Sequence, residues 1–390
     1  MRIALDARWI FEQMSGIGAY TAELIRALAS VDRENEYVLL FNRASLRDRT
    51  VRDLRLGDAA NVHTRVVPYG VFSPVGQWAM PRILRRLEAD LYHSPNYMIP
   101  LLAFPRNRRG RLACVVTIHD VIPMIFPHHA PRSRKSRLFP LYRRLMREVG
   151  VRSHVIVTDS EASRRDVIRH LRMPSEREGS VRAVHCGVSS RFRPPPAESR
   201  RGSASGDPAR VLYVGRSDPY KNLVRLVEAF ADARSRCPFA ARLLLAGPPD
   251  ARYPEAGARA VALGLGDAVR WTGYLPDADL VRLYQQARVL VMPSLYEGFG
   301  LPVIEAMACG TPVVCSRIGA LEEVAGDAAL FVDPESVPDM AGAIGRVLTE
   351  PALASDLSAR GLRRAAGFTW EATARRTLEL YREAVAGAGR

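Results

Sequence analysis

Short runs of β-branched apolar residues alternate with helical patterns along the whole chain. Uninterrupted apolar runs of this kind are typical of strands that are covered on both faces, and strands separated by helices form parallel sheets. We therefore expect an α/β fold. The expected strands are residues 2–7, 37–42, 89–94, 113–120, 154–160, 181–187, 210–215, 242–247, 269–275, 288–294, 312–316 and 329–333.

The alternation is broken at RPPPAESRRGSASGDPA, residues 193–209. Its proline, serine and glycine content is typical of a linker between domains. A chain of 390 residues also fits two domains of roughly 100–200 residues each. We predict two α/β domains, residues 1–192 and 210–367, with a ligand site between them at the carboxyl ends of their strands.

The composition indicates a soluble globular protein, with 47% hydrophobic and 25% charged residues. No stretch reaches the roughly 20 apolar residues of a membrane-spanning helix. The N-terminal segment MRIALDARWIF alternates like a strand and lacks the features of a signal peptide, so we expect a cytoplasmic protein. The five cysteines form no CxxC pair, which favours reduced thiols over a zinc site.

The net charge of +15 lies entirely in the first half of the chain. Residues 1–200 hold 34 basic and 19 acidic residues, whereas residues 201–390 hold 22 of each. This asymmetry suggests an anionic partner, although an arginine-rich solvated face is the simpler alternative. Without zinc-finger spacing or an aromatic ribonucleoprotein motif, we expect no nucleic acid. The basic segment 132–147 favours an anionic membrane surface or a lipid-diphosphate-linked acceptor, at roughly 1 kcal/mol per basic residue near such a surface.

The segment PSLYEGFGLPVIEAMACGTPVV, residues 293–314, predicts a strand, a glycine-bearing loop and a helix that begins near Leu301. The glycines allow the backbone to approach a ligand, and a helix N-terminus attracts anions, so the segment suits a phosphate or diphosphate. Glu297 and Glu305 would repel such an anion. We therefore expect both carboxylates to accept hydrogen bonds from neutral hydroxyl groups, such as those of a sugar or a ribose.

The order E-G-F-G-L-P-x-x-E, followed by A-C-G-T-P-V-V, resembles the signature of retaining glycosyltransferases of the GT-B fold, family 4. Glu297 and Glu305 match the E-x7-E motif of that family. The resemblance implies two Rossmann-like domains with parallel sheets facing a central cleft, and a C-terminal helix, residues 368–390, that crosses back to the N-terminal domain. It implies that Glu297 contacts the sugar hydroxyls and Glu305 the ribose. The other donor-binding residues implied here are Gly298, Phe299, Gly300 and Leu301.

The segment GRSDPYKN, residues 215–222, is similar to the G-R-x-x-x-x-K-N segment of the same family. The resemblance assigns Arg216 and Lys221 to the donor diphosphate. Lys221 is one of only two lysines among 56 basic residues, in a chain that otherwise uses arginine. Tyr274 and Leu275 stand where the family contacts the nucleobase.

Two N-terminal segments extend the resemblance. SGIGAY, residues 15–20, resembles the glycine-rich loop of the family, with Gly16 and Gly18 as donor-binding residues. TIHDVIPMIFP contains His119 and Asp120 at the end of a predicted strand, and the resemblance implies that Asp120 is a further donor-binding residue. In the family this histidine lies near the transferred sugar and hydrogen-bonds it, whereas a packed histidine at a strand end is the alternative.

One motif suggests a metal instead. Asp277 and Asp279 form a DxD pattern, by which another class of glycosyltransferases holds a divalent cation. Here both carboxylates fall at a predicted helix start, where capping and the helix dipole explain them. Arg216 and Lys221 can neutralise the leaving diphosphate, so we expect no metal and no cofactor.

The resemblance implies transfer of a sugar from a nucleoside-diphosphate donor with retention of the anomeric configuration. HSPNYMIP, residues 93–100, and TIHDVIP resemble bacterial mannosyltransferases that build surface polysaccharides, which favours GDP-mannose as the donor. The acceptor is then a glycan or a lipid-linked glycan. A GT-B-like epimerase or hydrolase of sugar nucleotides is the alternative.

Overall fold

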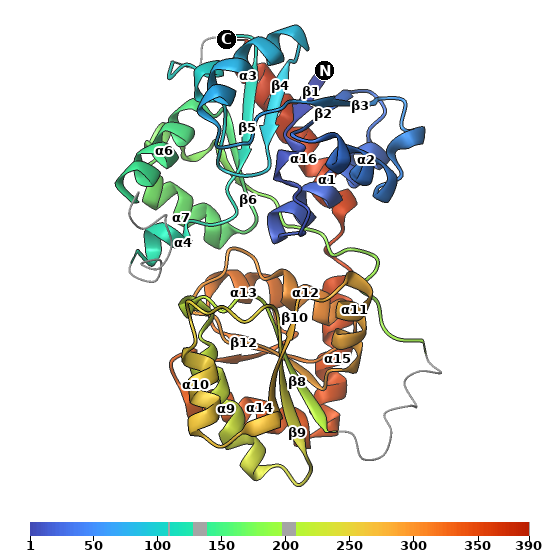
Figure 1. The fold of residues 1–390 in the computed structure, drawn as a ribbon, viewed down its shortest axis with the longest axis vertical. Coiled ribbons are helices and arrows are strands. Elements are labelled where there is room, and N and C mark those ends of the chain that lie inside the picture. Colours follow the sequence, from blue (N-terminus) through green and yellow to red (C-terminus); the bar gives the residue numbers. More distant parts are fainter. Residues whose placement is uncertain (108–109, 128–138, 197–207, 390) are drawn as a thin grey trace. The chain divides into compact units, whose positions relative to one another are not determined.

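Two units make up the chain, and each has its own parallel sheet (Figure 1). The computed structural model describes residues 1–107, 110–127, 139–196 and 208–389. The first unit comprises Met1–Ile125, Arg137–Gly187 and Thr369–Arg390, and the second comprises Phe126–Ser136 and Val188–Phe368. The end of the chain therefore belongs to the same unit as its beginning.

The first unit contains a sheet of seven strands in the order β3-β2-β1-β4-β5-β6-β7, and all neighbouring strands are parallel. Its central strands consist of buried residues, because helices cover the sheet on both faces (Figure 1). The strands are β1 (Arg2–Leu5), β2 (Glu36–Phe41), β3 (Val62–Val66), β4 (Leu91–Ser94), β5 (Ala113–Thr117), β6 (Val155–Thr158) and β7 (Val181–Ala183).

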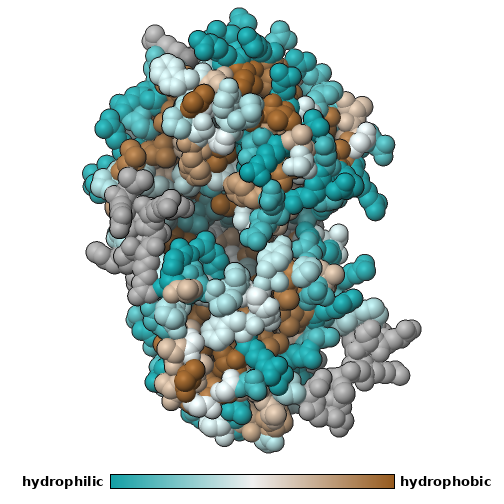
Figure 2. Space-filling view, viewed as in Figure 1, coloured by the Kyte–Doolittle hydropathy of each residue, from teal (hydrophilic) through white to brown (hydrophobic). Residues whose placement is uncertain are grey.

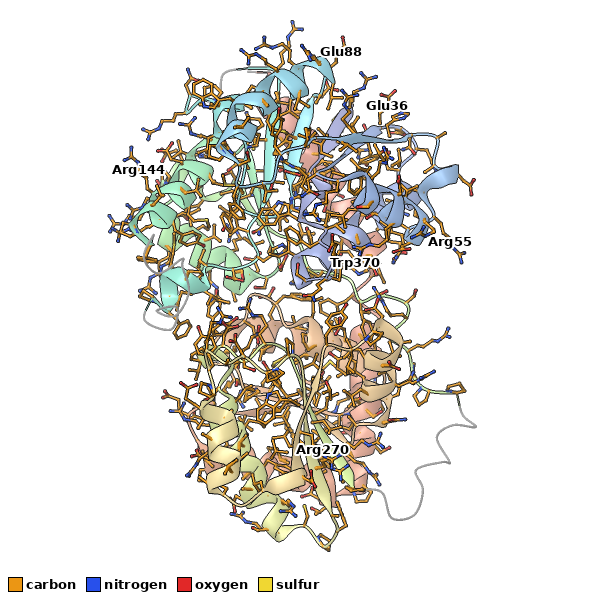
Figure 3. All side chains as sticks on the ribbon, in the orientation of Figure 1. Glu36, Arg55, Glu88, Arg144, Arg270 and Trp370 are labelled. Atoms are coloured by element: carbon orange, nitrogen blue, oxygen red, sulfur yellow. The ribbon has the colours of Figure 1, made fainter. Side chains whose placement is uncertain are left out.

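The C-terminal helix of the chain, α16 (Trp370–Ala388), packs on the first helix, α1 (Gly16–Val31), and on β5. Gly187 permits the close approach at its start, because a Cβ atom there would lie 2.2 Å from the Trp370 nitrogen. Figure 3 labels Trp370 at this end of α16. The other helices of the unit are α2 (Ala44–Asp53), α3 (Pro74–Arg86), α4 (Ile122–Ile125), α6 (Phe139–Arg152), α7 (Glu161–Leu171) and α8 (Ser175–Glu178).

The second unit repeats this architecture with six parallel strands in the order β10-β9-β8-β11-β12-β13. The strands are β8 (Ala209–Val214), β9 (Ala241–Ala246), β10 (Val269–Gly273), β11 (Val289–Met292), β12 (Val313–Ser316) and β13 (Leu330–Val332). The helices are α9 (Leu223–Arg236), α10 (Glu255–Ala262), α11 (Asp277–Gln286), α12 (Leu301–Ala308), α13 (Gly319–Ala325), α14 (Val337–Thr349) and α15 (Pro351–Ala365).

The predicted α/β fold with parallel sheets is confirmed, and all twelve expected strands are present, most of them a few residues shorter than expected. The prediction missed β3, with the sequence VHTRV. This strand lies at the edge of the sheet, and its residues are alternately half-buried and exposed. It therefore lacks the uninterrupted apolar run that identifies the inner strands.

Each sheet has a point where the strand order reverses direction, between β1 and β4 in the first unit and between β8 and β11 in the second. Ligands of open α/β sheets bind outside the carboxyl ends of the strands at this switch point. The loops that follow these four strands are therefore the places to look for functional side chains.

Candidate active site

In the second unit, the loops that follow β8 and β11 are hydrogen-bonded to each other. The Leu295 amide donates to the Tyr220 carbonyl at 2.8 Å. The Asn222 side-chain amide donates to the carbonyls of Pro293 (3.0 Å) and Pro334 (2.7 Å). Asn222 is buried and adopts a left-handed φ of 63° at the start of α9. These bonds fix the two loops across the switch point.

Lys221 and Glu297 meet between these loops. The Lys221 Nζ atom donates to Glu297 Oε1 at 2.7 Å and to Oε2 at 2.8 Å, and Ser294 Oγ donates to Oε1 at 2.6 Å. The two charged side chains are only 14% and 10% exposed. Burying an ion pair costs desolvation energy that good geometry must offset. An ammonium group is therefore held in place at the switch point, with its charge balanced by a carboxylate.

Arg216, the other predicted diphosphate ligand, lies in a different environment. Its side chain is 67% exposed and pairs with Asp218, with 2.8 Å between Nε and Oδ2. Its backbone carbonyl accepts a 2.7 Å hydrogen bond from the buried Tyr213 hydroxyl, which fixes the backbone but leaves the guanidinium in solvent. Solvent at the guanidinium weakens this pair, although Asp218 itself is only 16% exposed, so the guanidinium can turn toward an anion.

The predicted helix after the glycine loop is α12, which begins at Leu301 as expected. Gly300 precedes it with a φ of 109°, and a Cβ atom there would lie 2.6 Å from Leu321 Cδ2. A side chain is therefore excluded at Gly300 by both backbone conformation and packing. Phe299 is buried against Phe368, with ring centroids 6.0 Å apart, so only its backbone is available to a ligand, while Gly298 is half-buried.

Glu305 lies on the second turn of α12 and accepts a 2.8 Å hydrogen bond from the buried Tyr284 hydroxyl. Burial raises the pKa of Glu305 to about 7, although the hydrogen bond from Tyr284 and the charge of Arg191 lower it. The two glutamates of the motif thus have different partners. Glu297 is bound to a cation, whereas Glu305 is bound to a neutral hydroxyl and titrates near neutral pH.

Tyr274 and Leu275 follow β10, which ends at Gly273, and Tyr274 is 60% exposed. Asp277 and Asp279 lie in the first turn of α11, where the helix dipole favours acidic residues, but the N-cap is Pro276 and no side chain caps this helix, so the expected capping role is wrong. Asp277 pairs with Arg191, and Asp279 pairs with Arg282. Within the described ranges, no group of three or more His, Cys, Asp or Glu side chains is placed to hold a metal ion.

In the first unit, His119 follows β5, and protein groups occupy both of its ring nitrogens. Nδ1 lies 2.7 Å from Asp159 Oδ2, and Nε2 lies 2.9 Å from the Pro95 carbonyl. Both partners are acceptors, which favours the doubly protonated, positively charged form of the ring. Burial alone lowers the pKa of His119, but the Asp159 carboxylate and the Pro95 carbonyl raise it above the ordinary value.

The partner that orients His119 is therefore Asp159, not Asp120, the acid that follows it in the sequence. Asp120 Oδ1 accepts a 3.0 Å hydrogen bond from the Ile122 amide and so starts α4. Asp159 follows β6, the neighbour of β5 in the sheet. Its position at a strand end is the signal that could have identified it.

The predicted glycine loop is instead the beginning of a helix. α1 starts at Gly16, and Ser15 caps it by accepting a 3.1 Å hydrogen bond from the Gly18 amide. A Cβ atom at Gly18 would lie 3.0 Å from Met14 Sδ and 3.4 Å from the Trp9 carbonyl, so a larger residue would displace the preceding loop. Ser15, in the place of a family glycine, therefore serves as the helix cap.

The basic segment 132–147 is described only in part, since residues 132–138 lie outside the described residues. Its second part is on α6, where Leu141 and the guanidinium-bearing Arg143 and Arg144 are exposed. Arg144 projects away from the unit in Figure 3. None of the helices in the described part of the chain combines the length and the apolar character that a bilayer crossing requires.

Other residues of the site carried no signal that singled them out. Asn222 joins the two loops, Ser294 holds the Glu297 carboxylate within the loop after β11, and Tyr284 binds Glu305. Ser294 and Asn222 lie inside the matched segments but are small polar residues of a kind found in any loop. Tyr284 lies on α11 and reaches Glu305 from a distance of 21 positions in the sequence, which periodicity does not reveal.

Both units match family models. The model described as "Glycosyltransferase Family 4" matches residues 14–192, and the model described as "Glycosyl transferases group 1" matches residues 196–364. The two matched segments together cover most of the chain, one in each half.

Curated relatives resemble the chain over different lengths. The O-antigen chain mannosyltransferase B of Escherichia coli is 32% identical over 98% of this chain and 100% of the relative. A D-inositol 3-phosphate glycosyltransferase of Frankia alni is also 32% identical, over 96% of this chain and 95% of the relative. The MMP alpha-(1->4)-mannosyltransferase of Mycolicibacterium hassiacum is 33% identical over 59% of this chain and 54% of the relative.

Solved structures share the fold. The sucrose-phosphate synthase of Thermosynechococcus elongatus superposes with a TM-score of 0.76 at 24% identity, over 99% of both chains. HepE of Anabaena, solved with UDP-glucose, superposes with a TM-score of 0.72 at 17% identity, over 97% of this chain and 98% of that protein. The chain therefore has the two-unit parallel α/β fold of GT-B glycosyltransferases.

Proposed function

Because the chain belongs to the group 1 glycosyltransferases, family 4, we propose that it transfers a sugar from a nucleoside diphosphate to an acceptor hydroxyl with retention of the anomeric configuration. The C1–O bond to the β-phosphate breaks and a C1–O bond to the acceptor forms. The acceptor proton passes to the departing diphosphate, which leaves as nucleoside diphosphate. No oxidant, reductant or cofactor takes part.

The observation that carries this proposal is the ammonium group of Lys221 at the switch point of the second unit, which binds Glu297 in the loop that leads into α12. The difficult step is the departure of a multiply charged diphosphate. A fixed cation and the positive end of a helix stabilise the charge that develops on it, and preorganised groups of this kind often contribute most to the rate enhancement of an enzyme. Exposed Arg216 adds a second positive charge that can move.

The Lys221–Glu297 pair suggests how the donor is bound. When a diphosphate takes the Lys221 ammonium, Glu297 loses its main partner and can accept hydrogen bonds from hydroxyls of the transferred sugar. Ser294 continues to hold the carboxylate in place. Glu305 accepts hydrogen bonds from the ribose hydroxyls, and Tyr274 and Leu275 contact the base. His119 Nε2, which faces the Pro95 carbonyl in the structure, donates to the transferred sugar when the donor is bound.

We favour GDP-mannose as the donor and a glycan, free or lipid-linked, as the acceptor. Two of the relatives are named as mannosyltransferases, one of them for the O-antigen chain, which is a bacterial surface polysaccharide. The metal-independent mechanism follows from Lys221 and Arg216, which supply the positive charge that a cation would otherwise bring.

A binding screen tests the proposal. Nucleotide sugars that differ in base and sugar are titrated against the wild-type chain, the Lys221→Ala variant and the Arg236→Ala control. Arg236 lies on α9 in an exposed pair with Asp232. We expect one nucleotide sugar to bind, the Lys221 variant to bind it more weakly, and the control to bind it like the wild type. In a transfer assay with that donor, the Lys221 variant should lose roughly 10²–10³-fold in turnover. Failure of every donor to bind, or equal binding by Lys221→Ala, contradicts the proposal.

Attachment to an anionic membrane surface is a separate proposal, based on the basic segment 132–147. Its described part exposes Leu141 beside Arg143 and Arg144 on α6, a combination of apolar and basic side chains that suits a lipid interface. Sedimentation with vesicles tests it. We expect binding to vesicles that contain anionic lipid and little binding to neutral vesicles, and equal partitioning onto both contradicts it.

A further inference from the structure

Four aromatic rings meet at the carboxyl ends of the strands in the first unit, and nothing in the donor site uses them. Trp9 lies at the centre, with ring centroids 5.7 Å from Phe72, 6.3 Å from Tyr97 and 6.5 Å from Phe11. Phe72 and Tyr97 are themselves 6.3 Å apart. Trp9 is 4% exposed, whereas Phe72 is 56% and Phe11 is 40% exposed. A buried indole thus supports two rings that face solvent.

Hydrophobic residues reach the surface at several places on the face drawn in Figure 2, so exposure alone does not mark a site. The aromatic cluster differs because polar contacts hold it in place. Trp9 Nε1 lies 3.4 Å from Ser94 Oγ, which itself donates to the carbonyls of Asn96 (2.6 Å) and Met98 (2.8 Å). This chain of bonds joins the segment after β1 to the segment after β4.

The loops that carry the exposed rings are also fixed. The Arg49 guanidinium on α2 donates to the Phe11 carbonyl at 2.6 Å and to the Glu12 carbonyl at 3.0 Å. Arg8 donates to the Tyr69 carbonyl at 3.1 Å and so anchors the turn before Phe72. Rigid aromatic rings bind a ligand at low entropic cost, because few rotatable bonds remain to be ordered.

The location of the cluster indicates a ligand site. Trp9 follows β1 and Tyr97 follows β4, the two strands between which the strand order of the first sheet reverses. This is the same topological position that Lys221 and Glu297 occupy in the second unit. Ligands of open α/β sheets bind at this position.

We propose that Phe11 and Phe72, supported by Trp9 and Tyr97, form a stacking platform for a pyranose ring of the acceptor. The proposal rests on the glycosyl transfer proposed above. One face of a pyranose consists of C–H groups with partial positive charge, which complements the negative face of an aromatic ring. The exposed rings are those of Phe11 and Phe72, both in contact with Trp9, and such isolated ring faces suit a saccharide better than a long lipid chain.

The charges around the cluster favour a neutral ligand. Arg43 and Arg49 are the basic residues that contact the Phe11 loop, and both are engaged with it, Arg43 with the Glu12 carboxylate at 2.7 Å and Arg49 with two carbonyls. They therefore hold the loop instead of presenting charge to an anionic membrane. A neutral saccharide needs no opposite charge.

The experiment measures saccharide binding by ligand-observed saturation-transfer NMR on the full chain. The probes are methyl glycosides and disaccharides of mannose, glucose, galactose and N-acetylglucosamine. The variants are Phe72→Ala, Phe72→Trp and Phe11→Ala, with Phe239→Ala as the matched control, because Phe239 is similarly exposed between α9 and β9. The donor affinity of every variant is measured in parallel.

We expect at least one probe to bind the wild type through its C–H face, and Phe72→Ala and Phe11→Ala each to weaken it roughly 3- to 10-fold. Phe72→Trp and Phe239→Ala should retain binding, and all variants should bind donor as the wild type does. The platform is overturned if all variants bind the saccharide equally or if the wild type binds none. It is also overturned if Phe72→Ala and Phe11→Ala lose binding to lipid vesicles and keep their saccharide binding. A wild type that binds saccharides through these rings but binds no donor contradicts the glycosyl transfer and leaves the platform standing.

Discussion

The two units have the same strand order around their switch points, yet they place opposite kinds of side chain there. In the second unit, Lys221 comes from the loop after β8 and Glu297 from the loop after β11, so the ion pair joins two strands. In the first unit, the ion pair is formed within one loop, since Asp6 and Arg8 both follow β1. The groups that span the switch point there are aromatic rings.

The ion pairs also differ in their access to solvent. The side chains of Arg8 and Asp6 are 5% and 0% exposed, and the Tyr92 hydroxyl donates to Asp6 at 2.5 Å. Burial alone lowers the pKa of Arg8, but the Asp6 carboxylate raises it above the ordinary arginine value. The Asp6–Arg8 pair is closed on all sides, whereas the Lys221–Glu297 pair is partly open. The shared topology therefore determines where a site can form in each unit. The side chains that follow the strands determine whether the ion pair there stabilises the fold or can contact a ligand.

The largest expected effect tests the structural role of the closed pair. Arg8→Met leaves the Asp6 carboxylate buried without its cation, and removing one partner of a buried pair costs about 3–5 kcal/mol. We expect the free energy of unfolding of the first unit to fall by that amount in chemical denaturation, while the donor affinity of the folded fraction stays unchanged. The control is Arg2→Met, because Arg2 pairs with Glu36 on the surface and such pairs contribute about 0–1 kcal/mol. If both variants lost the same free energy of unfolding, the buried Arg8–Asp6 pair would stabilise the unit no more than a surface pair does.

The open pair should respond differently. Glu297→Gln keeps the shape of the side chain but removes the charge that balances Lys221. The Lys221 ammonium then lacks the carboxylate that competes with the diphosphate for it, so nucleoside diphosphate should bind as tightly as in the wild type or more tightly. Turnover should fall roughly 10- to 100-fold, because a hydrogen bond to a charged group contributes about 1.5–3 kcal/mol. Kinetics and calorimetry with nucleoside diphosphate separate the two effects, and a raised KM with unchanged kcat would show that Glu297 stabilises the bound donor and the transition state equally and so does not accelerate the chemical step.

Most of the fold could be predicted from the sequence, because the strands of a buried parallel sheet have short, uninterrupted apolar sequences. The exception is β3, whose position at the sheet edge leaves a weaker pattern. For the candidate site, the sequence placed the helix start at Leu301 and a strand end before Lys221, whereas the predicted strand 113–120 ran past His119 and the observed strand ends at Thr117. It did not indicate that Lys221 binds Glu297, since this contact joins residues 76 positions apart.

The same limit explains why the partner of His119 could not be predicted. Periodicity describes one element at a time, so it does not show which distant acid reaches the imidazole. The sheet brings Asp159 from the neighbouring strand end to Nδ1. The rings of the aromatic cluster come from three segments between Trp9 and Tyr97, and only the folded sheet brings them together.

A smaller expected effect is the pH dependence that Glu305 gives to the second unit. Burial raises the pKa of Glu305 to about 7, so the folded chain binds more protons than the unfolded chain between the ordinary glutamate value and 7. This group therefore lowers stability as pH rises through that interval. If the ionised carboxylate binds the ribose, donor affinity should fall below pH 7, by roughly tenfold per pH unit well below the pKa. Isothermal titrations from pH 5.5 to 8.5 should show this slope in the wild type and not in Glu305→Gln, and identical profiles would exclude a role for Glu305 ionisation.

The smallest expected effect lies at His119, because burial lowers its pKa while Asp159 and Pro95 raise it. The raised value in the folded state means that His119 stabilises the chain fully below its unfolded pKa of about 6.5, and that this contribution is lost as pH rises through the folded-state pKa. Asp159→Asn removes the carboxylate, so burial dominates and the pH dependence should reverse its sign. Denaturation midpoints at pH 6, 7, 8 and 9 measure the difference between wild type and variant, with the exposed His63→Asn on β3 as the control. Parallel curves for the wild type and Asp159→Asn would mean that the His119–Asp159 contact does not hold a protonated imidazole, and His119 would then be free to accept, rather than donate, a hydrogen bond at the sugar.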